Sequence, residues 1–415
     1  MSSDVRSIHD HLVAAVELAV PRVRYDVPVR ECAGLVLADD AIAEVAVPPF
    51  DNSAMDGFIV HCSDLQGDGP WELPVAGDIP AGSRPVDVPA GHAVRIMTGA
   101  PSPTGEGTED LIVVPVEQTN IPRGPVPLPE TVVIEQVDTS RAHLRRAGSN
   151  VQPGEVAATK GSRVDAGTIA ALISLGVDEV NVFAAPIVAV ISTGAELVER
   201  AEDAEGHQIP DSNLPMLAAL AAANGAGQVL EFHADDDNDA FRDVLSQAVA
   251  QADIIVTSGG VSVGAFDVVR AVTEESSEMW FGQVAQRPGE PQGLGWWAGT
   301  PLVCLPGNPV AAFNSFHAYM VPLMQATAGL DPQQELTDRP HVRVRVDEDF
   351  PAPHQPVTLM VPVKLDFSAE GVTATPFSSR GHSSHLVGSL VNTNGLAVVE
   401  YGDTSDERLV LLTRT

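Results

Sequence analysis

A short apolar run enters a glycine-rich turn in the stretch ADIIVTSGGVSVGAFDVV, residues 252–269, and few folds accommodate that order. A buried parallel strand that leads into such a turn presents backbone N–H groups to an anion, because glycine lets the main chain come close. Asp267, just past the turn, is placed to hold a divalent metal against that anion. The alternative is a tight strand-to-helix connection in which the glycines serve only the turn.

The same region alternates strand and helix patterns. Expected strands cover residues 187–191, 228–233, 254–256 and 302–305, and expected helices cover 216–224, 240–250 and 310–324. Asp211-Ser212-Asn213 with Pro215 supplies a cap for the first helix, and the aspartates around Asp235 favour the start of the second. This order predicts a doubly wound parallel sheet, whose ligands lie beyond the carboxyl ends of its strands. Residues at those ends are Glu196, Gly259, Gly260 and Pro306.

Two other regions have short apolar pieces separated by Pro, Gly and Asp, which predicts β structure. One is a β module at residues 46–142, and the other is a C-terminal β domain at 331–415. The polar loop from Asp51 to Gly57 and the Met97-Thr98-Gly99 segment are either site residues or plain turn chemistry. His382 and His385, three apart in a C-terminal loop, lack an evident third metal ligand, so a metal site is not expected there.

Helical spacing is expected at residues 5–19 and 166–175, on either side of the β module. We expect these two helices to pack together in a discontinuous N-terminal linker domain, residues 1–45 with 143–182, into which the module at 46–142 is inserted. The α/β domain then covers 183–330. The predicted fold class is therefore multi-domain α/β plus β.

The net charge of the chain argues against two classes of binding partner. The chain has 56 acidic and 23 basic residues, a formal net charge of −33, and only two lysines, Lys160 and Lys364. Such a surface repels nucleic acid and anionic lipid, so neither is expected as a general partner. A negatively charged substrate is expected where arginines gather, as at Arg141, Arg145 and Arg146; the alternative for this cluster is a solvated loop.

The expected cellular compartment rests on three features that the sequence does not show: a membrane span, a secretory signal and a disulfide framework. No apolar run approaches the ~18 residues of a membrane span, and the start MSSDVRSIHD does not resemble a secretory signal. Cys32, Cys62 and Cys304 are too far apart to suggest a disulfide framework or a zinc site. We therefore expect a cytoplasmic protein with no direct membrane insertion.

Six segments occur together in an order typical of one family: PPFDNSAMDGF, RIMTGAP, RRAGSN, ISTGAEL, TSGGVSVGAFD and LPGNPV. The chain resembles the molybdopterin molybdotransferases (MoeA), which include the E domain of the scaffold protein gephyrin. The resemblance implies a four-domain, elongated homodimer, with a cleft where the molybdopterin-binding α/β domain of one subunit meets the β module of the other. It also implies a reaction in which adenylylated molybdopterin and molybdate give molybdenum cofactor and AMP, with Mg²⁺.

The resemblance assigns roles to particular positions. It implies catalytic groups at Asp56, Thr98, Glu196 and Asp267, and metal ligands at Glu196, Asp235 and Asp267. Substrate and phosphate contacts are expected at Arg145, Arg146, Ser258, Gly259, Gly260, Ser262, Gly264, Arg287, Pro306, Gly307, Asn308 and Ser384.

Most departures from the family pattern reduce positive charge or add negative charge. Where the family places lysines around its KPGKP segment, this chain has Gln283, Arg287 and Glu290; Ser149-Asn150 replaces an expected acidic position, and Pro362 stands at an expected arginine. Each charge-assisted contact to a polyanion contributes about 1.5–3 kcal/mol, so losing several weakens binding by orders of magnitude.

Two functions remain open on this pattern. One is a molybdotransferase that uses Arg145, Arg146 and Arg287 in place of lysines. The other is a gephyrin-like dimeric scaffold that has lost catalysis and binds a short peptide tail of a tubulin-like cell-division protein or of a membrane receptor. For the second function, the edges and grooves of the C-terminal β domain are the expected binding surface.

Overall fold

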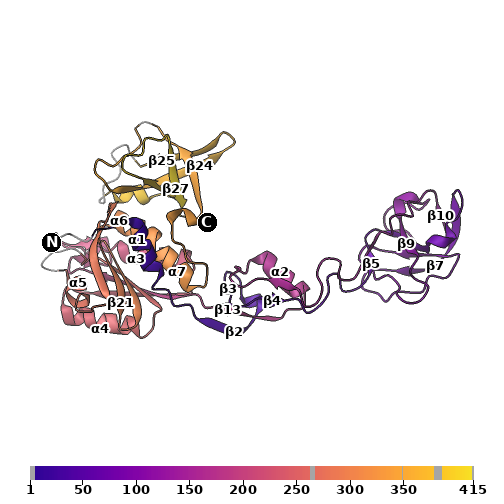
Figure 1. The fold of residues 1–415 in the computed structure, drawn as a ribbon, viewed down its shortest axis with the longest axis horizontal. Coiled ribbons are helices and arrows are strands. Elements are labelled where there is room, and N and C mark those ends of the chain that lie inside the picture. The colour runs from indigo at the N-terminus through magenta and orange to yellow at the C-terminus, as the bar shows by residue number, and fades with distance from the viewer. Residues whose placement is uncertain (1–4, 262–266, 348, 378–385, 414–415) are drawn as a thin grey trace.

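The computed structural model describes residues 5–261, 267–347, 349–377 and 386–413. Figure 1 shows an elongated chain. An α/β unit and a C-terminal β unit lie at one end, the β module lies at the other, and a small linker unit lies between them. None of the helices among the described residues is long and apolar enough to cross a membrane.

The α/β unit is built on a seven-stranded sheet. Its strand order is β1 (Val5–Arg6), β19 (Met279–Val284), β21 (Pro291–Trp297), β22 (Thr300–Leu305), β18 (Ile254–Ser258), β14 (Ile187–Thr193) and β17 (Gln228–Ala234). The last four strands are parallel, and their register pairs Ser258 with both Ser192 and Leu305. The carboxyl ends of β14, β18 and β22 therefore meet at one edge of the sheet.

The sheet is mixed, because β21 runs antiparallel to both β19 and β22. Only Ala298 and Gly299 separate β21 from β22, and both have positive φ, at 48° and 82°. Two consecutive residues with positive φ form a tight turn, and the twist of this turn matches the twist of the two strands that it joins in a β-hairpin. The expected parallel sheet is thus present in four strands, and this hairpin extends it.

Helices cover both faces of the sheet, as expected for a doubly wound fold. Alternate residues of β14 point to opposite sides: Val188 and Val190 pack into one core, and Ala189 and Ile191 into the other. Helices of the first face are α1 (Ile8–Val16), α3 (Asn213–Ala223), α6 (Pro309–Ser315), a π-helical turn at Phe316–Met320 and α7 (Val321–Thr327). Helices of the second face are α4 (Asn238–Val249) and α5 (Val268–Thr273).

The N-terminal helix differs from the expectation. α1 is shorter than the expected 5–19 and packs on α7 and the π-helical turn, not on the helix near residue 170. Leu12 is fully buried there, which stabilises the docking by about 2 kcal/mol. The physical reason is that Val5 and Arg6 form β1, whose pairing with β19 holds the start of the chain at the sheet edge.

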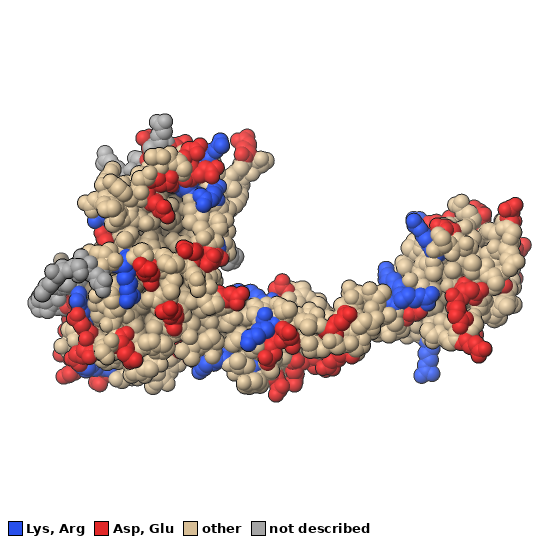
Figure 2. Space-filling model, viewed as in Figure 1, with Lys and Arg blue, Asp and Glu red and all other residues tan. Residues whose placement is uncertain are grey.

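The linker unit is made of segments on both sides of the β module. Its elements are β2 (Val23–Pro28), β3 (Val36–Leu37), β4 (Ala41–Ile42), β12 (Val156–Ala158), α2 (Ala166–Ser174) and β13 (Glu179–Phe183). Leu172 of α2 is fully buried against Cys32 and Leu37 in a core separate from that of the α/β unit. Acidic side chains gather along the lower edge of this unit in Figure 2. This face is unsuited to nucleic acid.

The β module is a five-stranded sheet with its own two cores. Its strand order is β10 (Thr131–Ile134), β7 (Trp71–Ile79), β8 (Ala93–Ile96), β6 (Gly57–His61) and β9 (Leu111–Pro115). A short pair, β5 (Asn52–Ser53) and β11 (Leu144–Arg145), joins the two chain passages that enter and leave the module.

The C-terminal unit packs on the α/β unit. Its sheet contains β20 (Gln286–Arg287), β24 (Thr358–Ser368), β26 (Gly395–Val399), β27 (Glu407–Leu412), β23 (His341–Arg345) and β25 (Gly371–Pro376). Met360, Leu396 and Leu411 lie in the same core as Phe316 of the α/β unit. The two units therefore share apolar packing as well as strand β20.

Candidate active site

A pocket of about 490 Å³ opens at the carboxyl edge of the α/β sheet. Its lining includes seven residues that the sequence singled out: Glu196, Ser258, Gly259, Gly260, Asp267, Gly307 and Asn308. They come from the segments that follow β14, β18 and β22. Parallel strands deliver these segments to one place because their carboxyl ends are aligned.

Glycine is required at two points of this pocket. Gly260 has a φ of 63°, and a Cβ there would lie 3.1 Å from the backbone nitrogen of Val269. Gly194 has a φ of 146°, and a Cβ there would lie 2.6 Å from the carboxylate of Glu196. Gly260 therefore provides both a backbone conformation and a close approach that another residue would prevent, whereas at Gly194 the backbone conformation alone requires glycine, because the Glu196 side chain can move.

The described lining of the pocket is acidic. Glu196, Asp236 and Asp267 contribute carboxylates, and no lysine or arginine contributes among the described lining residues. Over the described residues, no three His, Cys, Asp or Glu side chains are grouped closely enough to form a metal site by themselves. Mg²⁺ is commonly held by one or two carboxylates together with substrate phosphates, so this donor set fits that use.

The structure distinguishes between neighbouring aspartates. Asp236 lines the pocket and accepts a hydrogen bond from the backbone N–H of Ala195 at 3.0 Å. Asp235, which the sequence favoured as the metal ligand, is outside the described lining and its side chain is 77% exposed. A run of aspartates does not indicate which of them borders the pocket, as the exposed Asp236 does. The register of β17, the strand before these aspartates, decides which one does.

Asn213 is a second pocket residue that sequence reasoning missed. It had been assigned only to a helix cap, and the structure does place it at the start of α3. Its side-chain amide also contacts Ser258, the last residue of β18, and Gly307, in the turn after β22. The tripeptide Asp211-Ser212-Asn213 just before a helix was the available signal.

Three arginines were predicted to contact the substrate, and all lie outside the described lining of this pocket: Arg145, Arg146 and Arg287. Arg287 donates from Nε to Glu290 Oε1 at 2.8 Å, so a carboxylate of the same loop already neutralises it. Arg146 is paired with Asp51 at 2.5 Å, and Arg145 lies in β11 of the β module. None of these three therefore offsets the acidity of the pocket within one chain.

The Arg287 loop is held rigidly beside the pocket. The side-chain amides of Gln286 and Gln292 both donate to Ser315 Oγ at 3.0 Å, inside the protein. They lie in the strands on either side of the loop, and Ser315 lies in α6. A Cβ on Gly289 would lie 3.2 Å from Pro306, so the loop abuts the turn that contains Gly307. Pro306 itself is buried behind this turn.

Asp56 and Thr98 form a separate constellation in the β module. The backbone N–H and the hydroxyl of Thr98 both donate to Asp56 Oδ1 at 2.7 Å. These bonds, the backbone one first, lower the pKa of the Asp56 carboxyl. Asp56 borders a pocket of about 540 Å³ that also contains Arg95 and Arg123. Figure 1 shows the module at the opposite end of the molecule from the α/β unit, to which Glu196 and Asp267 belong.

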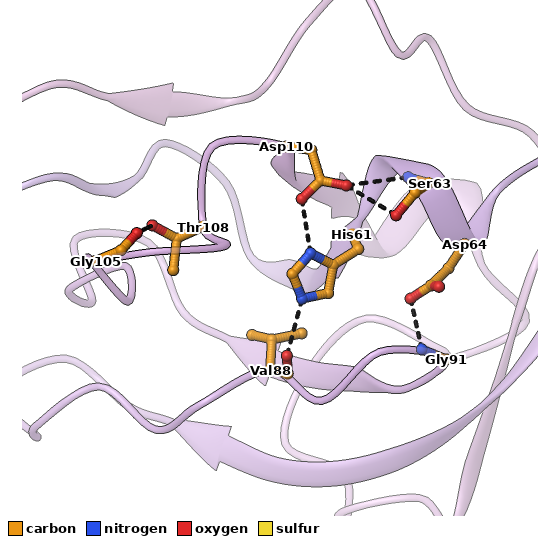
Figure 3. Close-up of polar contacts among 8 residues, drawn as sticks. All are labelled: His61, Ser63, Asp64, Val88, Gly91, Gly105, Thr108 and Asp110. Atoms are coloured by element: carbon orange, nitrogen blue, oxygen red, sulfur yellow. Dashed lines mark hydrogen bonds and ion pairs between the residues drawn. The ribbon is translucent and has the colours of Figure 1, made fainter.

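Figure 3 shows a Ser, His and Asp group in the β module that is not a nucleophilic triad. Ser63 Oγ donates to Asp110 at 2.9 Å, whereas His61 contacts the other oxygen of Asp110 at 2.7 Å and the carbonyl of Val88 at 2.9 Å. A nucleophilic serine would have to donate to the histidine. The group instead fastens the loops that contain Val88 and Asp110 to the end of β6.

We expect His61→Leu to lower the free energy of unfolding by about 2 kcal/mol at pH 6 and by less at pH 9. Both ring nitrogens of His61 face acceptors, so the doubly protonated ring fits best, and the hydrogen bond to Asp110 raises the pKa of His61. A raised pKa adds stability that is complete below about pH 6.5 and is lost as the pH rises through the folded value. Denaturant unfolding of both proteins at the two pH values measures the difference. An equal loss at pH 6 and pH 9 would contradict this expectation.

Three predicted contact residues, Ser262, Gly264 and Ser384, lie outside the described residues, as do His382 and His385. The structure therefore leaves those assignments as predictions.

Comparisons with known proteins agree with the architecture. Residues 5–176 match the MoeA N-terminal region (domain I and II), 189–326 match a probable molybdopterin binding domain, and 343–407 match the MoeA C-terminal region (domain IV). Molybdopterin molybdenumtransferase 2 of Mycobacterium tuberculosis is 39% identical over 348 residues, which cover 81% of this chain and 82% of the relative. The chain belongs to the MoeA family.

Other MoeA proteins are also similar to this chain in sequence and in structure. The molybdopterin molybdenumtransferase of Haemophilus influenzae is 36% identical over 314 residues, covering 75% of this chain and 74% of the relative. The crystal structure of a MoeA protein from Pyrococcus horikoshii superposes with a TM-score of 0.77 at 26% identity, covering 99% of this chain and 100% of that one. The expected family and the expected multi-domain α/β plus β fold class are thereby confirmed.

Proposed function

We propose that this MoeA-family chain acts in molybdenum cofactor biosynthesis by inserting molybdate into adenylylated molybdopterin and releasing AMP. The observation that carries the proposal is the pocket at the carboxyl edge of the sheet, where backbone turns and three carboxylates meet. The family's named transferases support the reaction class. We place the reaction in the cytoplasm.

Each part of the pocket has a proposed task. In the turn at Ser258 to Gly260, where the backbone N–H of Gly259 already donates to the carbonyl of Leu305, the Ser258 hydroxyl and the N–H of Gly260 bind anionic oxygens of the substrate, and Gly307 and Asn308 close the opposite side. One or two of the carboxylates of Glu196, Asp236 and Asp267, together with substrate phosphates, would hold Mg²⁺, and the bound ion would offset the negative charge of phosphate and molybdate oxygens. The carboxylates also fix the orientation of the bound substrate within the pocket.

We propose further that the working site needs two chains. Asp56 and Thr98 belong to the β module and Asp267 to the α/β unit, and Figure 1 shows these units at opposite ends of the molecule, so one chain does not bring the residues together. A homodimer with two-fold symmetry would place the β module of one subunit at the α/β pocket of the other. Arg145 would then supply positive charge that the pocket lacks within its own chain, whereas Arg146 is already paired with Asp51.

Complementation tests this two-chain site. Asp56→Asn and Asp267→Asn chains are each expected to be inactive alone. After co-expression, about half of the dimers contain one chain of each kind, and each of these has one intact site, so activity returns to about a quarter of the wild-type value. If both residues acted within one chain, the mixture would remain inactive.

The reaction itself is tested with purified protein, adenylylated molybdopterin, molybdate and Mg²⁺. We expect AMP release together with a product that activates a molybdenum-free apoenzyme. Release must stop when EDTA removes Mg²⁺. AMP release without any activating product would overturn the proposal.

Glu290 is expected to weaken substrate binding because it neutralises Arg287. Glu290→Gln should lower the KM for adenylylated molybdopterin by about tenfold, since a charge-assisted contact becomes available to the substrate. Glu275→Gln is the matched control, because Glu275 pairs with Arg242 at 2.7 Å, outside the described pocket lining. It changes the net charge equally and should leave KM unaltered. An equal drop in KM for both variants would mean that only net charge matters.

A second candidate function is a dimeric scaffold that has lost catalysis and binds a peptide tail of a tubulin-like division protein or of a membrane receptor. The observation that favours it is the set of exposed large apolar residues on the C-terminal unit, Phe367, Phe377, Val391 and Tyr401. Peptide binding should persist in Asp267→Asn and weaken in Phe367→Ser. A dimer that binds no such peptide would exclude this candidate.

A further inference from the structure

We infer that Asn213 is a positioning residue that braces the two substrate-binding turns and orients the hydroxyl of Ser258 toward the ligand. This inference rests on the proposed function for its substrate, but the brace itself is a property of the free protein. Asn213 is the first residue of α3, and it joins Ser258, the last residue of β18 where one turn begins, to the turn that follows β22.

The side-chain nitrogen of Asn213 makes two short contacts. Nδ2 donates to Ser258 Oγ at 2.7 Å and to the carbonyl of Gly307 at 2.6 Å. The carbonyl can only accept, so the nitrogen of the amide must face it and the oxygen must point away. Both Nδ2 hydrogens are thereby used to connect the two turns.

The hydroxyl of Ser258 is left with a defined role. Its oxygen accepts from Asn213, and among the described residues its hydrogen has no protein acceptor. Ser258 lines the pocket and is only 3% exposed, so bulk water does not compete freely for that hydrogen. The hydroxyl is thus held ready to donate to an anionic oxygen in the pocket.

The brace is itself fixed from behind. Asp211 Oδ1 accepts from the backbone N–H groups of Asn213 and Leu214, at 3.1 Å each, which holds the start of α3 in place. The two turns are also in close contact, because a Cβ on Gly307 would lie 3.3 Å from the Cα of Gly259. Loss of the Asn213 amide therefore loosens two segments that already touch, without leaving a large cavity.

Steady-state kinetics of Asn213→Ala tests the inference against substrate. We expect KM for adenylylated molybdopterin to rise about tenfold, since two hydrogen bonds that preorganise the pocket are lost, while kcat changes less than threefold. In a Ser258→Ala background the same substitution should raise KM less than threefold, because its main target is gone. Equal effects in both backgrounds would overturn the role assigned to the hydroxyl.

Amide hydrogen exchange tests the brace without any substrate. Asn213→Ala, and Asn213→Ser as a smaller perturbation, should speed exchange at residues 258–260 and 307–308. The control is Asn224→Ala, at the other end of α3, where the side chain hydrogen-bonds to the carbonyl of Leu220 within the same helix. Unchanged exchange at both turns would overturn the inference. Faster exchange in a protein that shows no turnover would sustain the brace and reject the proposed function.

Discussion

Asp267→Asn is expected to lower kcat for molybdate insertion by roughly 100-fold, the scale of loss when one preorganised electrostatic contact is removed from an active site. Asp267 lies between the glycine turn and α5, at the position that caps the helix, and lines the pocket. Asparagine keeps the shape of the side chain and removes its charge. The variant should therefore fold normally and lose the ability to hold Mg²⁺ beside the substrate.

The measurement is the rate of AMP release at saturating substrate over a range of Mg²⁺ concentrations. Asp243→Asn is the control, because Asp243 is exposed on α4 and outside the described pocket lining. Its kcat should match that of the wild type. A kcat for Asp267→Asn within threefold of the wild type would remove Asp267 from the catalytic group.

Acid is expected to destabilise the protein strongly through two buried histidines. Burial first, and then the charge of Arg6, lower the pKa of His11 to about 3. Burial first, and then Arg339, lower the pKa of His317 to about 3 as well. Neither ring has a hydrogen-bond partner that satisfies its nitrogens among the described residues. His11 instead packs against Trp280 at 5.2 Å between ring centroids.

The direction of this pH effect follows from the protonation of the two histidines in the folded and the unfolded state. The unfolded histidines take up protons near pH 6.5, whereas the folded ones remain neutral until about pH 3. Their stabilisation is therefore complete above pH 6.5 and is lost as the pH falls toward 3, by about 1.4 kcal/mol per pH unit for each histidine. Net charge would act in the opposite direction, because mild acid reduces the self-repulsion of this acidic chain.

Denaturant unfolding at pH 7, 6 and 5 measures the dependence. We expect His11→Gln to be less stable at pH 7 and to show about half the pH dependence of the wild type. His207→Gln, at an exposed histidine, should leave the dependence unchanged. A wild-type free energy of unfolding that rises steadily from pH 7 to pH 5 would contradict the expectation.

Much of the fold could be read from local patterns. The strand and helix periods between Ile187 and Thr327 predicted the doubly wound unit, because each buried strand there is short, apolar and followed by turn residues. Non-local pairing was harder to foresee. Nothing in Val5-Arg6 indicates a partner at Gln283-Val284, and Ala298-Gly299 is a weaker hairpin signal than Asn-Gly.

The residues of the candidate site also fall into two groups: those that the sequence indicated and those that only the folded chain brings together. Gly259 and Gly260 were evident because their turn must follow a buried strand, and Glu196 and Asp267 because the family motif places them beside it. The place of Asp236 in the pocket lining depends on the register of β17 beside β14. The contact of Asn213 with Gly307 joins residues 94 positions apart, so only the folded chain brings them together.

The central claim is that this family member handles a polyanionic substrate with a pocket short of positive charge. The most direct test is the KM for adenylylated molybdopterin, measured side by side for the wild type and for a Gln283→Lys/Glu290→Lys variant at fixed Mg²⁺ and molybdate. Two restored charged contacts should lower KM by roughly 100-fold, with turnover in both proteins. Equal KM values, or no turnover by either protein, would contradict the account.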